Sequence, residues 1–521
     1  MKTGLALLIA APVIAVLGTL LASLARFEAD LWRHLLTFWL PDVAGNTALL
    51  MLGVGLGVTV LGTALAALVS LTEFPGRRWL ASALLLPMAM PGYVLATVVI
   101  GQLDYAGPLA TLFRDWGLRL PEIRSLSGVV ITLTLTLYPY VYLVARGAFA
   151  SQGARAMDAA RLMGFGPWQA FWRVALPQAR PWILGGALLA LMETLADFGT
   201  VSAFGITTFT TAVYRAWFAL FSIDVALQLA LVMLLVIVVL VIAERLSRRH
   251  ARFTSTHSAP ARLTLGRWRW AVTLACVTVL MLGFGLPVLQ LVYWALSATP
   301  HPAALWTLAG RSLSLAGLAA GLTVTLAVVL ALVGRTSRSR SVSGLQTLAT
   351  LGYALPGPLL ALGLYVPFAA SIQLINQQLG LMLMVQGGVG LLLVAYAVRF
   401  MAVAHTPLYT QLMRLSPSVD DASRLLGVSR ARRLRWVYLP PLGTATLTAG
   451  LLVFVDVMKE MPITLMMRPF GWDTLAVRVF EFTREGQWAD AAAPSLGIVA
   501  VGLLPVLLLT RVFKQGSPNV S

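Results

Sequence analysis

Charged residues are scarce in this chain. Asp, Glu, Lys and Arg make up 11% of its 521 residues, whereas a soluble domain contains about 25%. Hydrophobic residues make up 59%, which is more apolar surface than the core of a soluble protein can bury. A soluble globular fold is therefore excluded, and the composition indicates a helical protein that crosses a membrane several times.

Cysteine is nearly absent, and histidine is rare. Cys276 is the single cysteine, so the chain has no internal disulfide. The five histidines are scattered, and none has a neighbour at the spacing of a metal site. We therefore expect no metal ligands and interpret the histidines as polar loop residues.

The phosphate-binding P-loop is also missing. Its lysine must follow a glycine, but Lys2, Lys459 and Lys514 follow methionine or phenylalanine. Any ATP hydrolysis that drives this chain must then reside on another subunit. The pattern Gly53-Val54-Gly55 lies within an apolar run and indicates close helix packing, not a dinucleotide site.

Long apolar stretches are what the chain does contain. Twelve of them approach the length of about 20 residues that spans a bilayer, so the predicted fold class is an all-α polytopic membrane protein. Prolines such as Pro91 and Pro356 interrupt two stretches, where neighbouring helices can accommodate a helix breaker. The expected spans are residues 4–24, 47–71, 79–101, 128–148, 182–203, 225–243, 270–295, 312–334, 345–370, 381–404, 443–461 and 491–512.

The distribution of basic residues predicts the orientation. With the N-terminus in the cytoplasm, the cytoplasmic segments contain 27 basic residues and five acids, and the rest contains 11 basic residues and 15 acids. This asymmetry follows the positive-inside rule and places both termini in the cytoplasm. Because the basic residues are spread over every cytoplasmic loop, the net charge of +18 does not indicate nucleic-acid binding.

The second half of the chain repeats the first at an offset of 263 residues. For example, Thr211 to Arg215 corresponds to Thr474 to Arg478. Six spans in each half return the chain to the cytoplasm, so the halves form a parallel duplication. The predicted domains are a first transmembrane half at 1–248, a cytoplasmic linker at 249–268 and a second half at 269–521.

One short motif occurs in both halves, on Arg-rich segments that the orientation places in the cytoplasm. It contains an acid, two small residues, a glycine and a Leu-Pro pair. We name the segment 151–181 loop 1 and the segment 414–444 loop 2. The motif residues are Asp158, Ala159, Ala160, Gly164, Leu176 and Pro177 in loop 1, and Asp421, Ala422, Ser423, Gly427, Leu439 and Pro440 in loop 2.

Each motif predicts two short helices with a break between them. Ser418 lies three residues before Asp421, which is the spacing of a helix-starting capping box. Gly164 and Gly427 suit the left-handed residue at a helix C-terminus.

The second short helix has its own signals. Pro167 fits the first turn in loop 1, and Ser429 can cap the corresponding helix in loop 2. The two Leu-Pro pairs are expected to stop this helix before the membrane. One copy alone could be an ordinary amphipathic loop, but two copies with identical spacing favour a paired binding surface.

Four acids are expected at membrane depth. Glu193 and Asp197 are one helical turn apart, and Asp456 and Glu460 repeat them in the second half. Charges at this depth usually face a bundle interior or a water path. They either border the path of a cationic solute or pair with groups such as Lys459 to hold the bundle together, and the sequence leaves both possibilities open.

The paired motifs resemble the EAA loops by which the membrane subunits of ABC importers engage their ATPase. The chain departs from that pattern with Asp in place of Glu in both copies and with Ser423 in place of the second Ala. The resemblance covers nearly the whole chain and implies the type I ABC importer permease fold in a fused, double-length form. It assigns ATPase coupling to the twelve motif residues of loops 1 and 2.

The same resemblance implies the partners. They are two cytoplasmic ATP-binding subunits, which would hold ATP and Mg²⁺ while this chain holds no cofactor, and a periplasmic or surface solute-binding protein. That protein would dock on the longest periplasmic segments, 104–127 and 462–490. The chain itself would be a multi-pass protein of the bacterial inner membrane.

Two stretches are most similar to the iron(III) branch of these permeases. They are residues 193–201 and 459–464, each with the polar segment that follows it. The resemblance implies iron(III) as the solute, with thiamine, a polyamine or aminoethylphosphonate as alternatives. A secondary transporter driven by an ion gradient is the alternative from another class, and a non-transporting membrane scaffold is the third.

Overall fold

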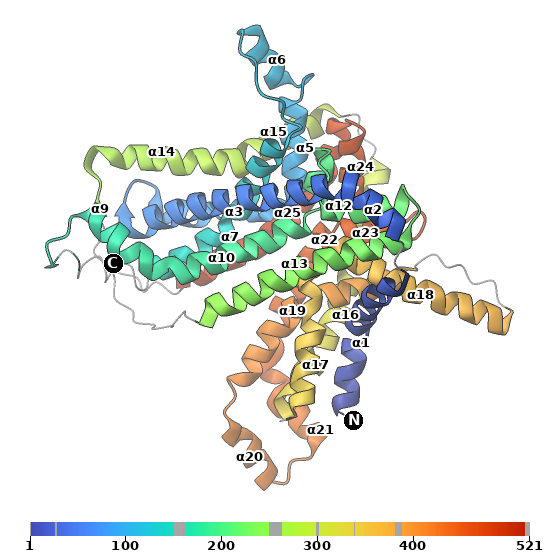
Figure 1. Cartoon of the computed structure of the whole chain (residues 1–521). Helices are drawn as coiled ribbons and strands as arrows, with labels where there is room; N and C mark the ends of the chain where they lie inside the picture. The colour runs from blue at the N-terminus through green and yellow to red at the C-terminus, as the bar shows by residue number, and fades with distance from the viewer. Residues whose placement is uncertain are drawn as a thin grey trace. The chain divides into compact units, whose positions relative to one another are not determined.

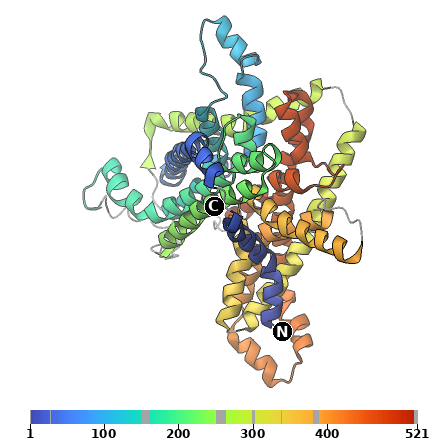
Figure 2. The ribbon, with the colours of Figure 1, turned by 45° about the vertical axis from the view of Figure 1, so that its right-hand side comes forward.

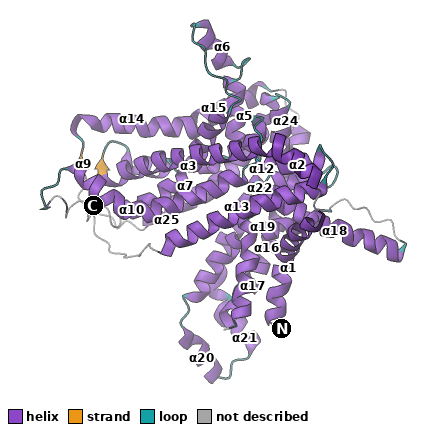
Figure 3. Cartoon of the chain, in the orientation of Figure 1, coloured by secondary structure: helices purple, strands orange, loops and turns teal. Residues whose placement is uncertain are grey.

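The computed structural model describes residues 2–26, 29–150, 160, 162–249, 263–298, 302–337, 339–380 and 388–515. These residues are almost entirely helical, and their strands are one short parallel pair, β1 (Thr72–Glu73) and β2 (Leu263–Thr264) (Figure 3). Twelve helical segments within them are long and apolar enough to cross a membrane. The predicted all-α polytopic fold class is confirmed.

Two of the expected spans were wrong at their start. The segments predicted at 79–101 and 345–370 are interrupted, and the spanning helices α5 (Gly92–Leu103) and α18 (Gly357–Leu379) begin only after Pro91 and Pro356. Both prolines have extended backbone, with ψ of 148°. The residue before a proline is disfavoured in the helical region, so each apolar run is divided into separate helices. The earlier pieces are α4 (Arg77–Ala83) with the 3₁₀ helix η2 (Leu86–Ala89), and α17 (Arg340–Thr350) with η7 (Leu351–Ala354).

The helices form two compact units that interleave along the chain. Unit 1 comprises Met1–Glu28, Val213–Leu231 and His301–Arg478, and unit 2 comprises Ala29–Ala212, Val232–Pro300 and Val479–Ser521. The first helix of each predicted half therefore belongs to the unit that contains most of the other half. The compact units and the predicted halves 1–248 and 269–521 divide the chain differently, and the duplication as such stays a prediction from the sequence.

Unit 1 is built on the helices α16, α19 and α22, with α1 packed along α17 and α18. Figures 1 and 2 show α1, α16 and α17 side by side. Lys2 Nζ donates to the carbonyl of Thr336 at 2.6 Å, so α1 starts at the end of the unit where α16 stops. The bounds are α1 (Lys2–Ala22), η1 (Ser23–Arg26), α16 (Pro302–Thr336), α19 (Val389–Met413), α20 (Pro417–Leu425), α21 (Arg430–Arg433), the π-helix η8 (Leu434–Tyr438), η9 (Pro440–Leu442), α22 (Gly443–Lys459) and α23 (Pro462–Met467).

Unit 2 is built on the helices α3, α7 and α10. Gly62 of α3 lies at the crossing with α7, where a Cβ would approach the backbone oxygen of Tyr138 to 2.9 Å. This small residue allows close packing of the two helices. The bounds are α2 (Ala29–Phe38), α3 (Leu40–Leu71), α6 (Pro108–Asp115), α7 (Leu126–Ala148), α9 (Pro167–Ala170), the π-helix η4 (Phe171–Ala175), α10 (Leu176–Ala196), α11 (Gly199–Ala203), η5 (Gly266–Trp268), α14 (Arg269–Leu280), the π-helix η6 (Met281–Gly285), α15 (Leu286–Ser297) and α25 (Trp488–Gln515).

Three helices contain residues of both units. They are α12 (Phe209–Phe218), α13 (Ile223–Arg249) and α24 (Leu475–Arg484). The segment 462–490, which the sequence predicted to be a long loop, contains the helices α23 and α24.

Candidate functional site

The glycine corners of loops 1 and 2 have the same geometry. Gly164 has φ of +85° and Gly427 has φ of +67°, a left-handed conformation that other L-residues avoid. Around each glycine an amide donates to the carbonyl five residues earlier, from Phe165 to Ala160 and from Val428 to Ser423, both at 3.0 Å. This is the helix-ending Schellman bond, and the predicted corners are confirmed at both positions.

The first helix of loop 2 starts differently from the prediction. The capping residue is Ser416, whose Oγ accepts from the amide of Ser418 at 3.3 Å, and α20 begins at Pro417. The capping box from Ser418 to Asp421 was therefore wrong. The reason is that Pro417 is favoured at the first helical position, which moves the cap to the residue before it.

The small motif residues differ in exposure. Ala160 and Ser423 are buried within the chain, and Ser423 Oγ donates to the carbonyl of Asp420 at 2.8 Å. Asp421 and Ala422 are exposed, whereas Asp158 and Ala159 lie outside the described residues. The small side chain at position 160 or 423 therefore lets the loop pack against its own unit, and the preceding position faces outward in loop 2.

A pair of large apolar side chains precedes each glycine and is exposed. Leu162 and Met163 of loop 1 are 91% and 67% exposed, and Leu425 and Leu426 of loop 2 are 89% and 80% exposed. The two pairs correspond to each other at the 263-residue offset. This repetition in the sequence was the signal that could have identified both pairs. Exposed apolar residues that gather at one place indicate an interaction surface.

In loop 1 the second helix continues into a span-length helix, which corrects the prediction that Leu176-Pro177 stops it, whereas in loop 2 the helical segments η8 and η9 are separated at Leu439. In loop 1, α9 begins at Pro167 as predicted, and η4 leads directly into α10, whose first turn contains Pro177. Pro440 occupies the corresponding place, at the start of η9. A proline in a first turn removes an N–H that has no helical partner there, so the chain can remain helical.

Ser429 starts the second helix of loop 2, as predicted. Its Oγ accepts from the amide of Arg432 at 3.4 Å, and α21 begins at the next residue. From α21 the chain passes through η8 and η9 into α22. Each loop therefore leads along the chain into a helix long enough to span a membrane, α10 or α22.

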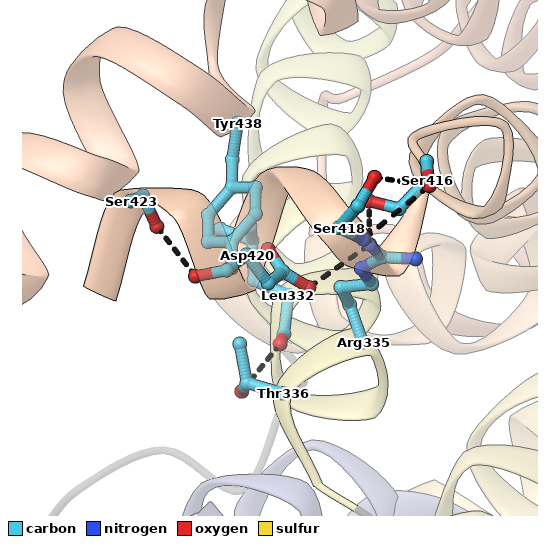
Figure 4. A network of polar contacts seen from close by, with 8 residues as sticks. All are labelled: Leu332, Arg335, Thr336, Ser416, Ser418, Asp420, Ser423 and Tyr438. Carbon is cyan, nitrogen blue, oxygen red and sulfur yellow. Dashed lines mark hydrogen bonds and ion pairs between the residues drawn. The ribbon is translucent and has the colours of Figure 1, made fainter. Parts of the chain in front are cut away.

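Loop 2 is attached to its unit through the carboxylate of Asp420, which the sequence reasoning did not single out. Arg335 Nη2 lies 2.9 Å from Asp420 Oδ2, and the Tyr438 hydroxyl donates to Oδ1 at 2.6 Å (Figure 4). The side chains of Arg335 and Asp420 are only 7% and 19% exposed. Burial raises the pKa of the Tyr438 phenol, and its hydrogen bond to Asp420 raises that pKa further, so the phenol remains a donor at neutral pH.

Loop 1 is attached by aromatic contacts. The ring of Phe171 in η4 lies 6.1 Å from that of Phe149, which is fully buried beyond the end of α7. Within loop 1, the Arg173 guanidinium lies 5.9 Å from the ring centre of Phe165. These are the distances of ordinary aromatic and cation–π contacts.

Two of the four membrane-depth acids end helices. Asp197 and Glu460 have extended backbone, with ψ of 128° and 117°, directly after α10 and α22. They are therefore not on one helical face with Glu193 and Asp456, and that part of the prediction was wrong. Glu193 and Asp456 lie within α10 and α22 and are partly buried.

The two helix-ending acids cap the short helices that follow. Asp197 Oδ1 accepts from the amide of Val201 at 3.1 Å, and Oδ2 accepts from the Thr200 hydroxyl at 2.8 Å. Glu460 Oε1 accepts from the amide of Ile463 at 3.2 Å. Both acids therefore stabilise the first turn of a short helix, α11 or α23.

Glu460 also has a cationic partner. Arg399 Nε lies 3.3 Å from Glu460 Oε2, with side chains 12% and 7% exposed, and the Arg399 guanidinium also donates to the carbonyl of Leu355. Arg399 lies on another helix, α19, and the pairing with Lys459 that the sequence suggested stays a prediction. At the 263-residue offset Arg399 corresponds to Thr136, so no cation stands at the equivalent position near Asp197.

The described residues contain no candidate metal-binding site. Within them, no group of three or more His, Cys, Asp or Glu side chains is arranged to hold a metal ion. The arrangement that stands out chemically is therefore the pair of loops, which combine a fixed glycine corner with exposed apolar side chains.

Comparisons with known proteins show which transport proteins the chain is similar to. Residues 58–253 match the family described as "Binding-protein-dependent transport system inner membrane component". The chain is 27% identical over 499 residues, 93% of each chain, to the "Fe(3+)-transport system permease protein FbpB 2" of Haemophilus influenzae. It is 32% identical over 162 residues, 31% of this chain and 57% of the relative, to the "Putative 2-aminoethylphosphonate transport system permease protein PhnV" of Salmonella typhimurium. It is 30% identical over 172 residues, 31% of this chain and 74% of the relative, to the "Putative molybdenum transport system permease protein YvgM" of Bacillus subtilis.

Proposed function

The chain belongs to the family of binding-protein-dependent transport system inner membrane components, and from this premise we propose that the solute it carries is iron(III). As a member it is a permease subunit of an ABC importer and a multi-pass protein of the inner membrane. We also propose that it is a transport subunit whose ATP is hydrolysed on a separate chain. The solute, the number of partner subunits and the sites of coupling are the parts that we propose.

Coupling would use the two loops. Two ATP-binding subunits, which hold ATP and Mg²⁺, would bind at the exposed pairs beside Gly164 and Gly427. With both termini and both loops in the cytoplasm, one double-length chain would serve both ATPases. Because each loop continues into a spanning helix, closure of the ATPases would move α10 and α22 and alternate the access of the path.

One observation supports iron(III). The similarity to the Fe(3+) permease extends over 93% of both chains, whereas the similarity to the aminoethylphosphonate and molybdenum permeases covers 31% of this chain. A permease of this kind receives its solute from a binding protein, so it needs no tight metal site of its own. Iron is here the cargo and not a resident cofactor.

Uptake by the reconstituted complex tests the solute. We expect ATP-dependent uptake of radioactive iron(III) into proteoliposomes that contain this chain, its ATPase and its solute-binding protein. Aminoethylphosphonate, thiamine and a polyamine, each offered at the same concentration, are expected to give no uptake above the ATP-free control. Uptake of one of these solutes without iron would replace the proposal by that alternative.

The same uptake assay distinguishes the two alternatives from other classes, because each predicts a different result. A secondary transporter would move solute without ATP when an ion gradient is imposed, and a scaffold would move none. We expect neither, because the loops place an exposed apolar surface on a segment that continues into spanning helices.

A role of Glu193, Asp197, Asp456 and Glu460 in the solute path stays a proposal. Asp197 and Glu460 already cap helices, so Glu193 and Asp456 are the sharper test. Replacing both by glutamine and asparagine respectively is expected to slow iron uptake in a folded complex. An unchanged rate and selectivity would remove them from the path.

A further inference from the structure

The carboxylate of Asp420 joins three segments of unit 1. It comes from the first turn of α20, Arg335 comes from the last turn of α16, and Tyr438 ends η8 (Figure 4). Arg335 Nη2 also lies 3.4 Å from the carbonyl of Ser416, the residue that caps α20. We name Asp420, Arg335 and Tyr438 the Asp420 cluster.

The positions of Asp420 and Arg335 at helix ends stabilise the cluster, in addition to its hydrogen bonds. An acid in the first turn of a helix and a base in the last turn of a helix both interact favourably with the helix dipoles. The ion pair is largely shielded from water, so salt screens it less than a surface pair. Hydrogen bonds between charged partners are directional, and they fix the orientation of α20 on α16.

Loop 1 has no equivalent of the cluster in its sequence. At the 263-residue offset, Asp420, Arg335 and Tyr438 correspond to Met157, Thr72 and Ala175. None of these three side chains can form an ion pair. A described contact that joins loop 1 to its unit is the aromatic one between Phe171 and Phe149, which is less directional than a charged hydrogen bond.

We propose that the Asp420 cluster positions loop 2 on α16, so that the two loops transmit the ATPase movement unequally. A force on α20 passes through the ion pair to α16 and through Tyr438 to α22. Among the described residues of loop 1, a force passes through the Phe171–Phe149 contact and along the chain into α10. The cluster residues are positioning residues, and this inference rests on the proposed coupling of the loops to an ATPase.

The test is the amount of solute moved per ATP hydrolysed by the full reconstituted complex. In the Asp420→Asn variant we expect this ratio to fall several-fold while the ATPase still co-purifies with the chain, because the surface beside Gly427 is unchanged. The charge exchange Asp420→Arg with Arg335→Asp is expected to restore much of the ratio. A merely structural loss would lower ATPase activity and uptake together and leave the ratio unchanged.

Two further variants keep the test decisive. Tyr438→Phe removes one hydrogen bond and retains the ion pair, so it is expected to fold and to lower the ratio less than Asp420→Asn. Met157→Asn is the matched substitution in loop 1 and is expected to leave the ratio unchanged.

Specific outcomes overturn the inference. It fails if Asp420→Asn couples normally, if Met157→Asn lowers the ratio equally, or if Asp420→Asn releases the ATPase. Failure of the unaltered chain to retain any ATPase would overturn the proposed function as well, so the two failures are distinguishable.

Discussion

Replacing Gly164 and Gly427 by valine in one chain is expected to abolish the retention of an ATPase and the uptake that depends on it. Both glycines have positive φ, where an L-residue is strained by roughly 1–2 kcal/mol and a β-branched residue by more. The corner bond from Phe165 to Ala160, or from Val428 to Ser423, would then be lost. The apolar pair beside it would change direction, and we expect association to weaken by at least about tenfold.

Matched variants separate this conformational effect from side-chain bulk. Asparagine tolerates the left-handed region, so Gly164→Asn with Gly427→Asn is expected to retain the ATPase. Gly185 lies within α10, has ordinary φ and has open space beside its Cα, so Gly185→Ala should have no effect. The measurement is the ATPase retained on affinity-purified chain, with uptake rate beside it. Normal retention by the valine variant would show that the corners do not orient a binding surface.

Arg399→Met is expected to cause the largest loss of stability. Removal of one partner from a buried ion pair leaves an unpaired charge and destabilises a protein by about 3–5 kcal/mol. Glu460, whose side chain is 7% exposed, would lose the contact of its Oε2 with Arg399, although it would still cap α23 through Ile463. The measurement is the midpoint of thermal unfolding in detergent.

A second substitution identifies the cause of that loss. Glu460→Gln keeps the capping oxygen and removes the charge, so the double variant Arg399→Met with Glu460→Gln is expected to recover much of the stability. Asp224→Asn breaks the exposed pair with Arg26 in the same unit and should change little. If the double variant is no more stable than Arg399→Met, the loss comes from packing and the ion pair is not the reason.

Most of the fold could be predicted from the lengths of the apolar stretches and from glycine and proline at turns and helix ends. Twelve spans, the left-handed Gly164 and Gly427, and the start of α9 at Pro167 all follow from local rules and are present in the structure. Hydropathy could not locate the breaks at Pro91 and Pro356, because the residues on both sides of each proline are apolar. It also could not assign α1 and α14 to their units, since helix partners are chosen by tertiary packing.

The polar contacts of the site were predicted less well, for a physical reason. Asp420 and Asp421 are adjacent, and the partners that hold Asp420 against the unit, Arg335 and Tyr438, lie 85 and 18 residues away in the sequence. Glu460 likewise has a partner, Arg399, on another helix, and no local sequence pattern indicates that contact. Asp197 and Glu460 looked like helix-face residues because the helix end after α10 and α22 has no glycine to mark it.

The sidedness of the two loops tests the central claim most directly. With Cys276→Ser as background, single cysteines at Met163 and Leu426 can be labelled by a membrane-impermeant thiol reagent in inner-membrane vesicles. We expect both to react in inverted vesicles only, and both to be protected when the ATPase is bound. Labelling of either cysteine only in right-side-out vesicles, or no protection by the ATPase at either position, would contradict the account.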